Sequence, residues 1–129
     1  MANFATQKTP VNPDDVAPDK SEVRILAQLE SCGMAEFRLA AGTVSLAVEH
    51  LTVDEIWYVV SGAGEMWRSQ EGREEITYLN PGISLTIPVG TRFQFLAADG
   101  APLRVIGVTI PRWPGADEAQ VREGHWPTC

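Results

Sequence analysis

The feature that most constrains the fold of this chain is a regular succession of short apolar runs separated by turn sequences. Among the runs are EIWYVV, ISLTIP and LRVIGVTI, and the turns between them include SGAG, NPG and PVG. This pattern predicts about nine strands of roughly five to eight residues each. Helical periodicity is confined to windows of about ten residues or fewer. We therefore predict an all-β chain whose antiparallel strands form a sandwich or barrel.

Length and charge limit the organisation and the partners of the protein. With 129 residues, 44% of them hydrophobic, the chain is long enough for one domain with a core of its own. Its net charge is −7 and it has no basic cluster. Phosphate-bearing partners need clustered lysine and arginine side chains, so we expect the protein to bind neither nucleic acid nor an anionic membrane.

The sequence also predicts where the protein resides. The first residues lack the apolar region of a secretory signal, and no apolar run is long enough to span a bilayer. The two cysteines, Cys32 and Cys129, do not make the disulfide framework that small secreted domains use. We therefore expect a cytoplasmic protein with reduced thiols.

Composition divides the chain into three parts. Residues 1–20 contain three prolines and show no periodicity, which predicts an extended N-terminal arm. The strand-rich barrel covers residues 21–112, and a tail covers residues 113–129. Within the tail, residues 116–123 (ADEAQVRE) favour a short helix. Trp113 follows the last strand at a proline-fixed bend, and we expect it to pack the tail onto the barrel.

Two-residue alternation assigns faces to the central strands. In the run TVSLAVEH, Val48 and His50 point to one face, and in the run EIWYVV, Glu55 and Trp57 share a face. The connection LTVD is short enough for a hairpin. Such a hairpin would bring His50 and Glu55 together at one end of the barrel.

The run EIWYVV is apolar on both of its faces. Only one face of a strand can point into a barrel, so the outer face needs a cover, from either the N-terminal arm or a second subunit. A small barrel also has exposed strand edges to protect. Together these features predict a homodimer.

The same region resembles the first signature motif of the cupin superfamily, a group of small β-barrels. That motif has the pattern G-x5-H-x-H-x(3,4)-E-x6-G. The residues that match it are Gly42, His50, Glu55 and Gly62, while Val48 occupies the position of the first histidine. The longer stretch EIWYVVSGAGEMWR resembles small single-domain bacterial cupins.

The second cupin motif, G-x5-P-x-G-x2-H-x3-N, is matched further along the chain. Gly82, Pro88 and Gly90 have the required spacing. Phe93 and Ala97 stand at the histidine and asparagine positions. The resemblance implies an antiparallel double-stranded β-helix, also described as a jelly-roll barrel.

The resemblance also bears on metal binding. Metal-binding cupins hold their ion with three imidazoles and a carboxylate on the inner wall. Here Val48 and Phe93 stand where two of the imidazoles would be, and neither side chain can donate a lone pair. We therefore expect no metal and no other cofactor. A divalent transition metal, if one binds, would have only His50 and Glu55 as protein ligands.

The polar pair that remains supports three interpretations, and the sequence leaves them open. The preferred one is a barrel that binds a small organic molecule in an apolar cavity. The residues expected to line this cavity are Val48, His50, Glu55, Trp57, Trp67, Phe93 and Phe95.

The second interpretation is an enzyme with His50 and Glu55 as catalytic residues. It is either a metal-free isomerase or epimerase or a metal-dependent oxygenase with a partial ligand set. In the metal-free case, a carboxylate beside the histidine should favour the imidazolium form. The third interpretation is a structural pair in which the two side chains hydrogen-bond to each other and do no chemistry.

Overall fold

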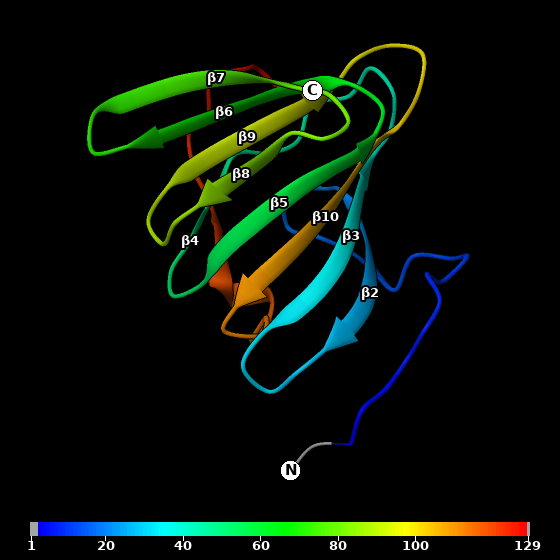
Figure 1. The fold of residues 1–129 in the computed structure, drawn as a ribbon. Coiled ribbons are helices and arrows are strands. Elements are labelled where there is room, and N and C mark those ends of the chain that lie inside the picture. Colours follow the sequence, from blue (N-terminus) through cyan, green and yellow to red (C-terminus); the bar gives the residue numbers. More distant parts are fainter. Residues whose placement is uncertain (1–2, 129) are drawn as a thin grey trace.

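The computed structural model describes residues 3–128 as two antiparallel sheets that face each other (Figure 1). The six-stranded sheet has the order β1 (Asp15–Val16), β2 (Glu22–Gln28), β3 (Gly33–Leu39), β10 (Leu103–Ile110), β5 (Asp54–Ser61) and β8 (Ser84–Ile87). The five-stranded sheet has the order β11 (Ala119–Val121), β4 (Val48–His50), β9 (Arg92–Ala97), β6 (Gly64–Gln70) and β7 (Arg73–Leu79). The predicted antiparallel all-β class is confirmed. Cys32 forms no disulfide with a described residue, and Cys129 lies outside the described residues.

The core lies between the two sheets, and alternation along β5 shows how the sequence builds it. Trp57 and Val59 are fully buried, whereas Tyr58, between them, is half exposed on the outer face of the sheet. Phe93 and Phe95 enter the same core from β9 in the opposite sheet. The period-two pattern of the sequence therefore corresponds to an inner and an outer face.

The glycines of the first motif have a structural cause. Gly62 has a φ of 84°, and a Cβ at this position would lie 2.3 Å from the carbonyl oxygen of Pro102. Gly42 has a φ of 72°, and a Cβ there would lie 2.6 Å from a carboxylate oxygen of Asp99. Both turns therefore need a residue that tolerates positive φ and has no side chain.

The connection between β4 and β5 differs from the predicted hairpin. β4 belongs to the five-stranded sheet and β5 to the six-stranded sheet, so the LTVD connection crosses from one sheet to the other. Its backbone N–H groups at Thr52 and Val53 donate to the carboxylate of Glu118 instead of to a partner strand. The prediction of a hairpin is wrong because the partner that satisfies this backbone lies far along the chain.

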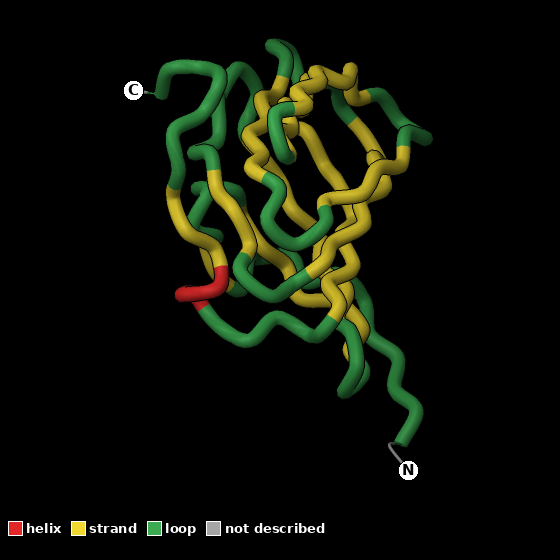
Figure 2. Tube along the Cα trace, turned by 90° about the vertical axis from the view of Figure 1, so that its left-hand side faces the viewer, coloured by secondary structure: helices red, strands yellow, loops and turns green. Residues whose placement is uncertain are grey.

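The C-terminal segment contains a single 3-10 turn, η1 (Ala116–Glu118), where a longer helix was expected at residues 116–123. The chain then becomes extended and forms β11, which pairs with β4 through Ala119 opposite His50. Figure 2 shows the turn leading into this strand at one side of the molecule. A strand is favoured there because β4 would otherwise present an unpaired edge.

The N-terminal arm and the C-terminal tail each contribute a strand to the sheets, so β1 and β11 lie outside the predicted barrel bounds of residues 21–112. In the arm, the carbonyl oxygens of Pro10 and Val11 accept hydrogen bonds from the guanidinium of Arg24. In the tail, the buried amide of Gln94 donates to the carbonyl oxygen of Trp126 and accepts from its N–H. Among residues 3–128, no helix is long and apolar enough to cross a membrane.

Candidate functional site

A cavity of about 780 Å³ lies between the two sheets. Residues 15–20 of the N-terminal arm line one part of it, and residues from the segment 112–119 line another. Inner-face residues of β2, β3, β4, β5, β9 and β10 complete the wall. Proteins bind small organic molecules in cavities of about 300–1,000 Å³, so this space is large enough for such a ligand.

Most of the residues predicted to line the cavity do so. The five in its wall are Val48, His50, Glu55, Trp57 and Phe93. Phe95 lies one layer further into the core, where its ring meets that of Trp57 edge-to-face with centroids 4.9 Å apart.

Trp67 lies on the opposite face of β6 and does not line this cavity. The inward-pointing residue of the pair is Met66, which is fully buried in the core. The indole of Trp67 stacks on His125 in the tail, with centroids 6.0 Å apart, and donates a hydrogen bond of 3.0 Å to Glu74. The tail therefore covers Trp67. This contact buries the side chain outside the cavity.

β4 places His50 at the inner end of the cavity, where the side chain is 4% exposed. Its ring meets Phe93 and Trp113 edge-on, with centroids 5.2 and 5.1 Å away. Nδ1 is buried and has no hydrogen-bond partner among the residues that the structure describes. Burial lowers the pKa of His50 to about 4, although the negative charge of Glu118 opposes this change.

Glu55 enters the same space from β5 and is 3% exposed. Its Oε2 atom accepts a hydrogen bond from Nε1 of Trp57. Burial raises the pKa of Glu55 to about 8, and the nearby charge of Asp19 adds to this effect. At pH 7 the carboxyl group therefore holds its proton.

The two side chains meet across the space between the sheets. Nδ1 of His50 lies 4.0 Å from Oε1 of Glu55, a separation that suits an ion pair only if both groups are charged. We assign the neutral forms, because the cost of removing two charges from water exceeds their attraction when the hydrogen bond from Trp57 is their only further support among the described residues. The expectation that the carboxylate would favour the imidazolium is therefore wrong, and at 4.0 Å the two do not hydrogen-bond directly.

Sequence reasoning did not find Glu118, which positions the LTVD connection between His50 and Glu55. Its Oε2 accepts from the N–H groups of Thr52 at 2.7 Å and Val53 at 3.2 Å, and its Oε1 accepts from the hydroxyl of Thr52. Burial alone would raise the pKa of Glu118, but these hydrogen bonds hold it below its usual value. No local pattern signals this role, because Glu118 lies more than sixty residues from the backbone it holds.

Trp113 was expected only to pack the tail, yet it lines the cavity and contacts His50. It reaches this position because the chain turns after β10 and passes the cavity before β11 pairs with β4. The sequence PRWPG, directly after a strand that ends beside the cavity, is the one signal that could have indicated this.

The side chains present do not fit a tightly held metal ion. Within residues 3–128, no three side chains of the His, Cys, Asp and Glu types are grouped to bind one. His50 and Glu55 are the only donors at the motif positions, and Val48 and Phe93 beside them are buried and apolar. Two ligands, one of them a carboxyl group that keeps its proton at pH 7, leave most of a coordination sphere to water.

Comparison with known proteins rests on structure, since no family model and no curated protein sequence matches this chain. KdgF from Halomonas sp. is similar with a TM-score of 0.64 and 28% identity, over 79% of this chain and 89% of that protein. The cupin domain of Cnp3 from Schizosaccharomyces pombe gives a TM-score of 0.66 at 12% identity, over 78% of this chain and 69% of that one.

A mutant of oxalate decarboxylase OxdC from Bacillus subtilis is similar over a larger part of this chain. The TM-score is 0.73 at 14% identity, and the match covers 93% of this chain but only 33% of the decarboxylase. At such low identity, this likeness concerns the arrangement of strands alone. The two facing antiparallel sheets and the structural neighbours together show that this chain is a cupin-fold protein.

Proposed function

We propose that the protein binds a small organic molecule in the cavity between its sheets. The observation that supports this most is the unpartnered Nδ1 of His50, buried at the inner end of a cavity with aromatic walls. Buried polar atoms in folded proteins nearly always have a hydrogen-bond partner. A ligand that enters the cavity would supply the missing partner.

The walls support the same proposal. Trp57, Phe93 and Trp113 present aromatic rings to the cavity, and His50 and Glu55 are among the polar residues that accompany them. Such a surface binds an apolar body by removing it from water, while a small number of polar groups sets its orientation. A cavity of about 780 Å³ is far larger than the packing defects that a core of this size tolerates.

The test is a fragment screen by saturation-transfer NMR on three proteins. Ala35 lines the cavity from β3, so the variant Ala35→Trp should fill part of it. Ala101→Trp adds the same indole at an exposed loop position and serves as the matched control. We expect fragments that bind the wild type and Ala101→Trp but not Ala35→Trp. Binding that survives in Ala35→Trp, or no binding to any of the three, contradicts the proposal.

The state of the polar pair favours a second candidate, metal-free acid–base catalysis. A neutral His50 is available to accept a proton and a protonated Glu55 to donate one, which is what an isomerase or epimerase needs in order to move a proton on its substrate. Replacing His50 by alanine should abolish turnover of any substrate identified, and unchanged turnover refutes this candidate. The metal-dependent oxygenase has less support, because its ligand set has only two donors here.

We further propose a homodimer that forms through the outer face of β5. Ile56, Tyr58 and Val60 are 47%, 53% and 37% exposed there. The neighbouring strand β10 adds Ile106 beside Tyr58 and Val108 beside Ile56. The apolar surface is therefore continuous across the two strands.

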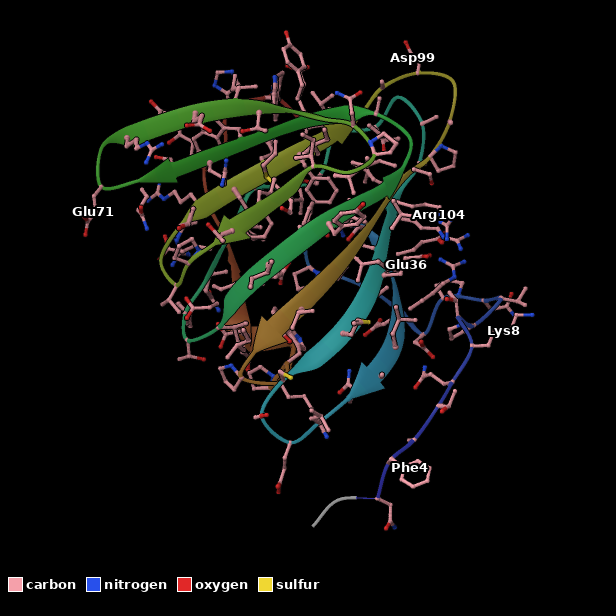
Figure 3. The ribbon with its side chains drawn as sticks, in the orientation of Figure 1. Phe4, Lys8, Glu36, Glu71, Asp99 and Arg104 are labelled. Carbon is pink, nitrogen blue, oxygen red and sulfur yellow. The ribbon has the colours of Figure 1, made fainter. Side chains whose placement is uncertain are left out.

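A cluster of ion pairs borders this apolar surface at one side. Glu36 accepts hydrogen bonds from Arg38 and Arg104, and Figure 3 shows Glu36 and Arg104 together beside the strands. A two-fold axis places the same patch on both subunits, so the apolar side chains of one copy would pack against those of the other. Light scattering on the eluted protein should give twice the mass of one chain, and a single-chain mass contradicts this proposal.

A further inference from the structure

The charge and hydrogen-bonding chemistry of the cavity indicate which class of ligand it takes, an inference that rests on the proposed function. We propose that the ligand is an uncharged, ring-bearing alcohol whose hydroxyl group sits between Nδ1 of His50 and Oε1 of Glu55. Its ring system would lie against Trp57, Phe93 and Trp113.

The first argument is the distance across the pair. The 4.0 Å between Nδ1 and Oε1 is too long for a direct hydrogen bond. One oxygen atom at about 2.8 Å from each of them closes that gap with ordinary hydrogen-bond lengths. Nδ1 has no other partner among the described residues, and Glu55 already uses its Oε2 to accept from Trp57. A bridging oxygen therefore satisfies the pair without moving either strand.

The second argument concerns which oxygen fits. A neutral imidazole carries its proton on one of two nitrogens, and a protonated carboxyl group donates one hydrogen bond. A hydroxyl group donates one hydrogen bond and accepts others, so it can bridge the pair with the proton on either imidazole nitrogen. A carbonyl oxygen can only accept, and it would leave Nδ1 unpartnered whenever that nitrogen lacks a proton. The hydroxyl group is thus the better match.

The third argument is charge. His50 and Glu55 are both neutral at pH 7, so neither of them is a counter-ion for a charged ligand group. The titratable groups that influence the pair are acidic, Glu118 near His50 and the cavity-lining Asp19 near Glu55, and neither of them favours an anion. A cation would need an ionised Glu55 or Asp19 beside it, and burial raises the pKa of both carboxyl groups. An uncharged group avoids both costs, because moving a charge into an apolar space without a partner is strongly unfavourable.

Positive side chains occur elsewhere in the cavity wall. Lys20 and Arg112 line it from the arm and from the segment after β10, and both residues are exposed. They are accessible to water, which screens their charge. The main rival to an uncharged ligand is an anion held by Lys20 and Arg112 instead of by His50 and Glu55. The experiment has to distinguish these two kinds of ligand.

The experiment uses four probes that share one ring system and differ in one substituent: naphthylmethanol, naphthoate, naphthylmethylammonium and methylnaphthalene, all substituted at the same ring position. Binding to the wild-type protein at pH 7 is measured by saturation-transfer NMR titration. We expect the alcohol to bind about fivefold more tightly than the methyl compound, the effect of one net hydrogen bond. The two ions should bind at least about tenfold more weakly than the alcohol.

A variant and a spectroscopic signal connect this preference to the pair. His50→Leu should bind methylnaphthalene as the wild type does but lose the advantage of the alcohol over it. In the wild type, the alcohol should shift the Nδ1 nitrogen resonance of His50, and the methyl compound should not. This second measurement needs no variant, so it tests the inference even if His50→Leu does not fold.

The outcomes separate this inference from the proposed function. Tighter binding of naphthoate or of the ammonium compound refutes the uncharged class and leaves a small-molecule cavity intact. Equal binding of the alcohol and the methyl compound, with no shift at Nδ1, refutes the bridging hydroxyl. Failure of all four probes to bind contradicts the cavity proposal as well.

Discussion

The buried carboxyl group of Glu55 should make the stability of this protein fall as the pH rises through neutrality. Its pKa is raised from 4.5 to about 8 by burial, a difference of about 3.5 pH units. The folded protein therefore holds a proton that the unfolded chain releases above about pH 4.5. The contribution of Glu55 is fully present below pH 4.5 and is lost as the pH rises to about 8. At about 1.4 kcal/mol per pH unit, the loss amounts to about 5 kcal/mol.

The variant Glu55→Gln isolates this contribution. Glutamine has the shape of the protonated acid, keeps an oxygen for Nε1 of Trp57, and does not ionise. His50 has the opposite dependence, since its pKa is lowered to about 4 and it resists protonation as the pH falls below 6.5. Both proteins contain His50, so its effect largely cancels when they are compared. We expect equal stability at pH 4.5 and a variant more stable by about 5 kcal/mol at pH 8.

Urea denaturation at intervals between pH 4 and pH 8.5 measures the free energy of unfolding of both proteins. Glu30→Gln removes one exposed negative charge at a residue that does not line the cavity and shows what a change in net charge alone does. A stability difference between wild type and Glu55→Gln that stays constant with pH would refute the reasoning. A wild type that gains stability over the variant as the pH rises would show instead that Glu55 is ionised and paired with a charged His50.

Three further predictions concern the surroundings of the site. Glu118→Gln should lower the free energy of unfolding by about 3 kcal/mol, because a carboxylate that accepts three hydrogen bonds is lost. The control Glu123→Gln, on the same segment, should change it by less than about 0.5 kcal/mol. Equal urea midpoints for the two variants would show that Glu118 does not stabilise the LTVD connection. Trp113→Ala should weaken binding of naphthylmethanol roughly fivefold through loss of an aromatic wall, and unchanged NMR titrations would show that this wall is not used. Tyr58→Glu should give a monomer in light scattering, whereas the control Tyr78→Glu, on the exposed side of β7, should remain a dimer. A dimer for both variants would place the interface elsewhere.

The fold was predictable from the sequence because its signals are local. Alternating burial along β5 follows directly from the period of two, and positive φ at Gly42 and Gly62 explains why those positions are glycine. The short LTVD connection also predicted that His50 and Glu55 lie close together, and they do, although it crosses between the sheets instead of forming a hairpin. Each of these inferences needed only neighbouring residues, and each agrees with the structure.

The parts that were missed depend on contacts between distant segments. The alternation of β6 does not reveal which face Trp67 occupies, because the tail covers the outer face and both Met66 and Trp67 are buried. The LTVD connection resembles a hairpin turn until Glu118 is known to hold its backbone. A local pattern cannot report such long-range partners, so the wall formed by Trp113 was also missed.

The apolar residues at the two histidine positions explain both the missing metal ligands and the neutral pair. Val48 and Phe93 face each other across the pairing of β4 and β9, and they are 1% and 2% exposed. By excluding water around His50 they add to the burial that lowers the pKa of the histidine, and burial likewise raises the pKa of Glu55. The same two side chains provide apolar wall for a ligand. A barrel with these two side chains is less able to hold a cation and better able to hold an uncharged ring. Its ligand should therefore be sought among neutral organic molecules.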